Sequence, residues 1–102
     1  MARLQKLSLQ RLRAGRKCAD VAKFFYTYVL QSKKDNNLYI GWSDDLVERV
    51  SEHNRGKVTA TKSRSPMVLV YYEACLSRGN AIKREKALKT GFGRKYLKGR
   101  LK

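Results

Sequence analysis

The stretch LYIGWSDDLVERVSEHN contains three polar residues able to act on a phosphate: Tyr39, Arg49 and His53. A guanidinium holds phosphate oxygens, and an imidazole binds or releases a proton near neutral pH. Arg49 and His53 are four residues apart and would share one face of a helix. The alternative for each is a surface role, with Arg49 paired to Asp45 and His53 lying beside Glu52. The pattern predicts a phosphate site if the fold brings Tyr39 to that face.

Strands and helices alternate around these residues. FFYTYVLQ (24–31) and LYIGW (38–42) are rich in aromatic and β-branched residues and are joined by the turn-forming SKKDNN, which predicts a β-hairpin. A helix is expected from about 44 to 56, after cap-type and acidic residues. MVLVYYEA (67–74) predicts a third strand after a polar, basic loop.

Apolar spacing predicts which faces point inward. The expected core positions of the first helix are Leu46, Val47 and Val50. Strict alternation in the third strand places one set of side chains on one face, Val68, Val70 and Tyr72. The other face then carries Leu69, Tyr71 and Glu73.

A second helix is expected over RGNAIKREKALK (78–89), with Ser77 as its cap. Glu85 falls in the same stripe as the apolar Leu88. An inward acid is costly unless it is paired, hydrogen-bonded or bound to a metal. Alternatively, Glu85 lies at the edge of the stripe and pairs with Lys89. The sequence leaves both interpretations open.

The charge is concentrated at the two ends of the chain. The net charge is +16, and residues 1–24 hold seven basic and one acidic residue while 83–102 hold nine and one. This excess predicts a nucleic-acid partner; the alternative, solubility alone, needs a net charge of only ~2–8. We expect a basic N-terminal arm (1–23), one domain (24–91) and a basic C-terminal tail (92–102).

Several classes of protein are not expected. Cys18 and Cys75 are too far apart in sequence for a zinc knuckle and indicate a reduced, cytoplasmic setting. No apolar run approaches the ~20 residues of a membrane helix, so no membrane partner is expected. The N-terminal arm lacks the apolar core of a secretory signal, although it also resembles an organelle presequence.

The order of elements and polar residues resembles the GIY-YIG nuclease domain. Its second motif is present as YIG (39–41), and its first is degenerate, with YTY (26–28) retaining only the final tyrosine. Ten residues separate Tyr28 from Tyr39, as in the hairpin of that family. The segments AIKREKALK and TGFGRKYLK are similar to the small standalone bacterial members.

The resemblance implies a catalytic set of five residues: Tyr28, Tyr39, Arg49, His53 and Glu85. Glu85 is the implied ligand of Mg²⁺ or Mn²⁺, and Arg49 the implied phosphate ligand. One tyrosine would orient water or accept its proton, and the other would position it.

The implied fold is α+β, a small three-stranded antiparallel sheet flanked by helices. The implied function is a metal-dependent DNA endonuclease that hydrolyses phosphodiester bonds and is related to repair. The small size of the chain favours branched, flapped or single-stranded DNA over a defined sequence as its substrate. The alternatives are a catalytically weak or inactive nucleic-acid-binding module with the same fold, and a basic accessory protein of a ribonucleoprotein. Basic residues expected to contact nucleic acid are Lys33, Lys34, Arg55, Lys57, Lys62 and Arg64.

Two departures from the family pattern bear on activity, and the first of them, a missing lysine, favours the binding module together with the degenerate first motif. Some members have a lysine soon after the second motif, whereas this chain has Trp42-Ser43-Asp44 there. Lys33 or Lys34 would have to substitute. Many members also carry a polar residue, often asparagine, after the glutamate helix, and Thr90 is only a loose match for it.

Overall fold

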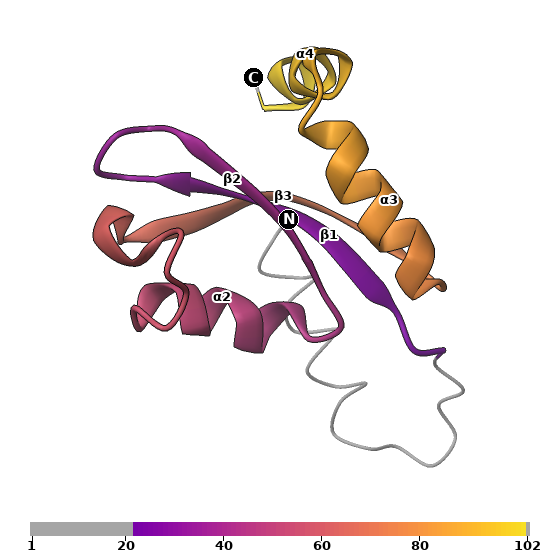
Figure 1. The fold of residues 1–102 in the computed structure, drawn as a ribbon, viewed down its shortest axis with the longest axis horizontal. Helices are drawn as coiled ribbons and strands as arrows, with labels where there is room; N and C mark the ends of the chain where they lie inside the picture. Colours follow the sequence, from indigo (N-terminus) through magenta and orange to yellow (C-terminus); the bar gives the residue numbers. More distant parts are fainter. Residues whose placement is uncertain (1–21, 102) are drawn as a thin grey trace.

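The computed structural model describes residues 22–101, so the predicted N-terminal arm lies almost wholly outside the described residues. Seven elements follow one another (Figure 1): β1 (Phe25–Ser32), β2 (Leu38–Ser43), α2 (Leu46–Asn54), the 3₁₀ turn η1 (Lys62–Arg64), β3 (Met67–Cys75), α3 (Arg78–Leu88) and α4 (Gly91–Arg100). The three strands form one antiparallel sheet with the order β2-β1-β3. The predicted α+β fold is confirmed. No helix among the described residues is long and apolar enough to cross a membrane.

The central strand β1 separates two packed layers, with α2 on one face of the sheet and α3 and α4 on the other (Figure 1). The core beside α2 contains Tyr28, Leu30, Leu46 and Met67. The core beside α3 and α4 contains Val29, Ile40, Leu88 and Leu97. Neighbouring residues of β1 therefore support opposite layers, as the two-residue period of a strand requires.

Helix α2 begins as predicted, because Asp45 caps it by accepting a hydrogen bond from the backbone N–H of Glu48. The expected inward position of Val47 is wrong, since its side chain is 52% exposed. Leu46, Val50 and His53 instead follow the i, i+4, i+7 stripe of one helix face, which turns Val47 away from the sheet.

The alternation predicted for β3 is also wrong, because the strand contains a β-bulge. Pairing with β1 steps from Tyr71 directly to Leu69, so Val70 is an extra residue. After this insertion, Leu69 and Tyr72 pack beside α2, whereas Val70 and Tyr71 pack beside α3 and α4. One inserted residue is enough to reverse the side-chain faces beyond it.

The C-terminal residues assigned from the sequence to a basic tail, 92–102, form most of α4. Leu97 is fully buried in the core beside α3. Gly93 permits the contact, because a Cβ there would lie 2.3 Å from the carbonyl oxygen of Ala87. Thr90 caps the helix by accepting from the backbone N–H of Gly93. Packing on the sheet therefore continues beyond residue 91.

Candidate active site

The two tyrosines, the histidine and Arg49 gather on the α2 side of the sheet. Tyr28 on β1 lies opposite Gly41 on β2. Tyr39 lies two residues before Gly41 on β2, so it is on the same face of the sheet. The His53 ring on α2 lies with its centroid 4.8 Å from that of Tyr39 and 5.8 Å from that of Tyr28. The strand-to-helix join therefore brings both tyrosines to one face of α2.

Tyr28, His53 and Thr61 form a buried hydrogen-bonded chain. Tyr28 Oη lies 2.9 Å from His53 Nε2, and His53 Nδ1 lies 2.7 Å from Thr61 Oγ1. Tyr28 is 1% exposed and His53 is 0% exposed. The surface-histidine interpretation is therefore wrong, and both ring nitrogens already have partners.

Burial keeps this chain uncharged. It raises the pKa of Tyr28 to about 12, against the opposing effect of the nearby Arg49 guanidinium. Burial lowers the pKa of His53 to about 4, and the positive charge of Arg49 acts in the same direction. At neutral pH the phenol keeps its proton and the imidazole is neutral, with one ring nitrogen donating and the other accepting.

Gly41, the glycine of the YIG motif, makes room for the Tyr28 hydroxyl. A Cβ at this position would lie 2.6 Å from Tyr28 Oη and 3.1 Å from Tyr39 Cε1. Real side chains do not make such contacts, so the two tyrosine rings and a side chain at position 41 could not coexist. The glycine of the YIG motif is therefore required for packing, in addition to the catalytic role that the family resemblance implies for the tyrosine of the motif.

Arg49 lies at the edge of the buried chain. Its side chain is 37% exposed, and Nη1 lies 3.0 Å from Glu52 Oε1 rather than pairing with Asp45 as the surface alternative proposed. Its charge lowers the pKa of Tyr28, which places the guanidinium close to that hydroxyl. Arg49 thus has a charged neighbour in its own helix and an accessible side toward solvent.

Glu85 of α3 shows features of both interpretations made from the sequence. Its side chain is only 17% exposed, and Oε2 lies 2.8 Å from Lys89 Nζ. Its negative charge also contributes to the raised pKa of Tyr28, which places Glu85 within electrostatic range of the buried chain. Glu85 is partly buried and paired at the same time.

Comparison with known proteins identifies the family. The family model of the GIY-YIG catalytic domain matches residues 24–97. The chain belongs to the GIY-YIG family. A UPF0213 protein from Staphylococcus haemolyticus is 40% identical over 74 residues, covering 72% of this chain and 89% of the relative. UPF0213 proteins from Syntrophus aciditrophicus and Lactiplantibacillus plantarum are 42% and 40% identical, over 63% and 66% of this chain and 75% and 68% of their own lengths. No solved structure matches significantly.

The predicted resemblance to small bacterial GIY-YIG proteins is confirmed by these matches. Membership assigns the chain to a family of nucleases, whose substrate is nucleic acid and whose members generally need a divalent metal. The names of these relatives state no activity.

The donor atoms of this GIY-YIG domain fit one kind of metal ion. Within residues 22–101 no group of three His, Cys, Asp or Glu residues converges, so a zinc site of the usual composition has no basis there. Glu85 supplies one hard carboxylate oxygen, and Mg²⁺ commonly takes one or two protein carboxylates and keeps several waters. Glu85 therefore suits Mg²⁺ or Mn²⁺ that is completed by water and substrate oxygens.

The basic residues predicted to contact nucleic acid divide into two groups. Lys34 Nζ donates to the carbonyl oxygen of Ser63 at 3.2 Å, and Arg64 Nε lies 3.2 Å from Asp35 Oδ2, so both tie the hairpin turn to η1. Arg55 pairs with Glu48 on α2 at 3.0 Å. The other group, Lys33, Lys57 and Lys62, is exposed and forms no side-chain ion pair within residues 22–101.

Thr61 is a part of the site that was not found from the sequence, and Thr90 has a helix-capping contact that was not predicted. Thr61 comes from a polar loop and has no pattern that indicates a histidine partner. Thr90, considered as a substitute for the family's asparagine, donates to the carbonyl oxygen of Ala87 at 2.6 Å and caps α4. Only the folded loop and the helix start reveal these roles.

Proposed function

We propose that this protein is a divalent-metal-dependent endonuclease that hydrolyses phosphodiester bonds in DNA. The observation that carries the proposal is the placement of a partly exposed cation, Arg49, and a partly buried carboxylate, Glu85, within electrostatic range of one tyrosine, Tyr28. Phosphodiester hydrolysis needs positive charge on the phosphate and a held water, and these residue types supply such groups.

Burial separates the five proposed residues into two roles. Tyr28 and His53 are too buried to touch a phosphate, so we assign them to positioning. Tyr39 lies partly exposed against the His53 ring and can reach a bound water or phosphate. Tyr39 is therefore the tyrosine that orients the water, and Tyr28 holds the histidine behind it.

The chain's own residues would act as follows. Arg49 binds two oxygens of the scissile phosphate through its planar guanidinium and offsets the charge that builds up during attack. Tyr39 holds the attacking water on the opposite side from the leaving oxygen. The His53–Thr61 bond fixes the imidazole ring that packs against Tyr39. A divalent ion held by Glu85 would neutralise phosphate charge and acidify a bound water.

One observation favours a second candidate, a nucleic-acid-binding module without turnover. Both charged groups of the site are already paired inside the protein, Glu85 with Lys89 and Arg49 with Glu52. Hydrolysis requires Glu85 to exchange Lys89 for a metal ion, whereas binding alone does not. The two candidates therefore differ in what happens at Glu85.

The deciding experiment compares Glu85→Gln with wild type and with Glu48→Gln, a control in which an exposed, paired glutamate of α2 loses its charge. Cleavage of flapped, branched and single-stranded DNA is measured with Mg²⁺ and Mn²⁺, DNA affinity is measured without metal, and Mn²⁺ binding is followed by electron paramagnetic resonance. Glu85→Gln should lose cleavage at least ~100-fold and lose Mn²⁺ binding, with DNA affinity equal or higher because a negative charge has been removed.

Glu48→Gln should match wild type in all three measurements. Binding of DNA by wild type without any cleavage would replace the endonuclease by the binding module. Normal cleavage by Glu85→Gln would remove Glu85 from the metal site.

A further inference from the structure

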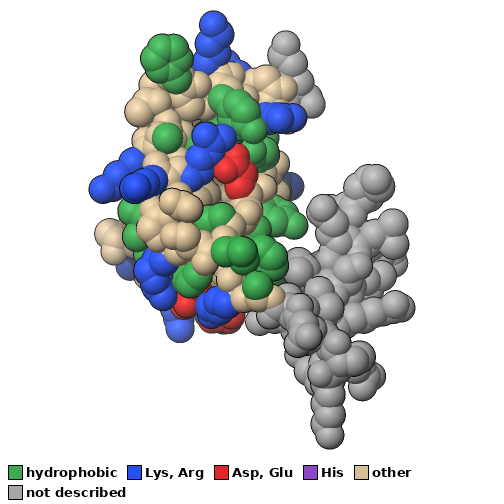
Figure 2. Space-filling model, turned by 90° about the vertical axis from the view of Figure 1, so that its right-hand side faces the viewer, with side chains coloured by type: hydrophobic (Ala, Val, Ile, Leu, Met, Phe, Trp, Pro, Cys, Tyr) green, Lys and Arg blue, Asp and Glu red, His purple; other side chains and the backbone are tan. Residues whose placement is uncertain are grey.

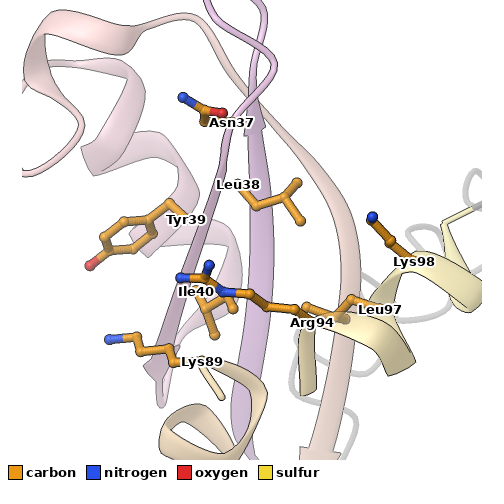
Figure 3. Close-up of a pocket in the computed structure, with 8 residues that line it drawn as sticks. All are labelled: Asn37, Leu38, Tyr39, Ile40, Lys89, Arg94, Leu97 and Lys98. Atoms are coloured by element: carbon orange, nitrogen blue, oxygen red, sulfur yellow. The ribbon is translucent and has the colours of Figure 1, made fainter. Parts of the chain in front are cut away.

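A pocket lies beside the candidate active site, between the edge strand β2 and helix α4 (Figure 3). Its volume is about 510 Å³, within the range of ~300–1,000 Å³ typical of sites for small ligands or single recognition groups. β2 and the residue before it supply one wall, and Leu97 and Ile40 supply apolar surface at the junction of the two elements. The pocket touches the candidate site through Tyr39, which belongs to both.

Three cations line the α3–α4 side of this pocket: Lys89, Arg94 and Lys98. The side chains of Lys89 and Arg94 extend toward β2 in Figure 3. Lys89 pairs with Glu85, but within the described part of the chain Arg94 and Lys98 form no ion pair. Two uncompensated cations facing one pocket indicate a site for negative charge.

The surrounding surface extends this charge. Helix α4 contains four basic residues and no acidic one. In Figure 2 the Lys and Arg side chains are widespread over the upper part of the molecule, where α4 lies. A surface of this kind attracts a polyanion rather than a single small anion.

The edge position of β2 suits an extended ligand. β1 covers only one side of β2, since the strand order is β2-β1-β3. Among the described residues the pocket wall is therefore an open strand edge, and Tyr39 belongs both to this wall and to the candidate site. A chain of phosphates lying along this edge would place one phosphate beside Arg94 and Lys98 and a neighbouring one near Tyr39.

We propose that this pocket is a subsite for the DNA strand next to the scissile phosphate, with Arg94 and Lys98 binding its backbone. The inference rests on the nucleic-acid part of the proposed function, and it concerns binding rather than catalysis. Lys89 is left out of the test because its replacement would also free Glu85.

The test uses the full chain and a fluorescent single-stranded DNA in metal-free buffer. Affinity is measured across a range of salt concentrations for wild type, for Arg94→Gln with Lys98→Gln, and for Lys86→Gln with Lys95→Gln. The last pair removes the same charge from exposed positions of α3 and α4 that do not line the pocket. All three proteins should unfold at the same temperature, because none of the four side chains forms an ion pair within the described residues.

The pocket variant should bind about tenfold or more weakly at low salt, since two charge-assisted hydrogen bonds are lost. Its plot of log affinity against log salt should be shallower by about 1.4, or ~0.7 for each phosphate contact on a single strand. The control pair should lose only a few-fold. Equal losses in both variants, or no loss in the pocket variant, would overturn the subsite.

A second readout locates the contact. Single phosphates of the DNA are replaced in turn by uncharged methylphosphonates. In wild type, one or two positions should weaken binding most, and this sensitivity should disappear in the pocket variant, because each contact then lacks one partner. Equal sensitivity of the two proteins at every position contradicts the proposal.

The two proposals fail separately. A wild type that never cuts DNA, but whose binding depends on Arg94 and Lys98, removes the endonuclease and supports the subsite. A pocket variant that binds and cuts as well as wild type removes the subsite and leaves the endonuclease. A wild type with no affinity for DNA would overturn both.

Discussion

The cations of α2 and those of α4 are held in opposite ways. At α2, Arg49 and the C-cap residue Arg55 each pair with a glutamate of that helix, at 3.0 Å in both cases. On α4, Arg94 and Lys98 face a pocket without an ion-pair partner among the described residues. The first arrangement fixes a guanidinium in one place, and the second leaves positive charge free to attract a ligand.

The difference follows from what lies beneath each helix. Beneath α2 is the buried Tyr28–His53–Thr61 chain, whose polar atoms satisfy one another at fixed distances. Beneath α4 is apolar surface around Leu97, which positions the helix but places no directional constraint on the cations above it. We infer that the α2 side holds its guanidinium group in an accurate position, whereas the α4 side attracts the ligand by its positive charge.

The largest change expected in this comparison comes from Gly93→Ala, which should detach α4. The new Cβ would lie 2.3 Å from the backbone of both Ala87 and Leu88, which cannot move aside as a flexible side chain can. We expect a loss of about 3 kcal/mol in the free energy of unfolding, together with weaker DNA binding through the misplaced pocket. Denaturant unfolding measures the first effect.

Gly99→Ala is the matched control for α4. Apart from the adjacent residues and the backbone of α4 itself, no atom of the described residues lies within 4 Å of a Cβ built there, so the change should stabilise the helix by up to about 1 kcal/mol. If Gly93→Ala were as stable as Gly99→Ala, the close contact between α3 and α4 would not be needed.

Arg49→Ala should remove the phosphate-binding group of the α2 side without unfolding the domain. Loss of a preorganised donor to the developing phosphate charge should lower cleavage by about 10²–10³-fold, with some loss of DNA affinity. Arg49→Lys should restore little, because an ammonium lacks the planar fork. Arg55→Ala, on the same helix, should stay near wild type, since an exposed pair contributes only ~0–1 kcal/mol. Equal effects of the two alanine variants would mean that α2 contributes only general charge.

The buried histidine predicts how stability changes with pH. The pKa of His53 falls from 6.5 to about 4 on folding, so between these values the unfolded chain binds more protons than the folded one. The contribution of neutral His53 to the free energy of unfolding is complete above pH 6.5 and is lost as the pH falls toward 4. The loss amounts to at most about 3 kcal/mol. His53 is the only histidine in the sequence.

His53→Gln isolates this contribution. The variant should be less stable at pH 7 and should show a smaller change in unfolding free energy between pH 7 and pH 4. The same pH dependence in both proteins would show that carboxylates, rather than His53, cause the acid sensitivity.

Tyr28→Phe should have a smaller effect on stability. Removing the hydroxyl leaves His53 Nε2 buried without its partner, at a cost of about 1–3 kcal/mol. Tyr72→Phe is the control, since Tyr72 packs against the same core and the change should stay within ~0.5 kcal/mol. If the two variants unfold alike, the Tyr28–His53 bond does not stabilise the site. Cleavage measured on the same proteins reports how far the bond positions Tyr39.

Deletion of residues 1–21 should have the smallest effect on the fold. The family match begins at residue 24, and the deleted segment contains six basic residues and one acidic residue. Cooperative unfolding at an unchanged temperature, with weaker and less salt-dependent DNA binding, is the expected result. Loss of cooperative unfolding would show that the segment is part of the domain.

Local patterns in the sequence were enough to predict the three strands and the helices α2 and α3. The aromatic and β-branched runs predicted all three strands, and Ser77 predicted the start of α3, because strand and cap preferences act over a few residues. Spacing along a helix also placed Arg49 and His53 on one face, whereas Tyr39 was added to them only by the resemblance to the family. These are properties of short segments, and they persist whatever surrounds them.

Tertiary contacts decided the rest. The β3 bulge, the exposure of Val47 and the docking of α4 through Gly93 and Leu97 depend on surfaces that meet only in the folded chain. The shift in the pKa of His53 depends on burial beneath its neighbours, which no local pattern encodes. The sequence by itself determined which groups are available for chemistry. The tertiary structure decided which are buried, which are paired and which face solvent, because burial and electrostatic interaction depend on distances between segments far apart in the chain.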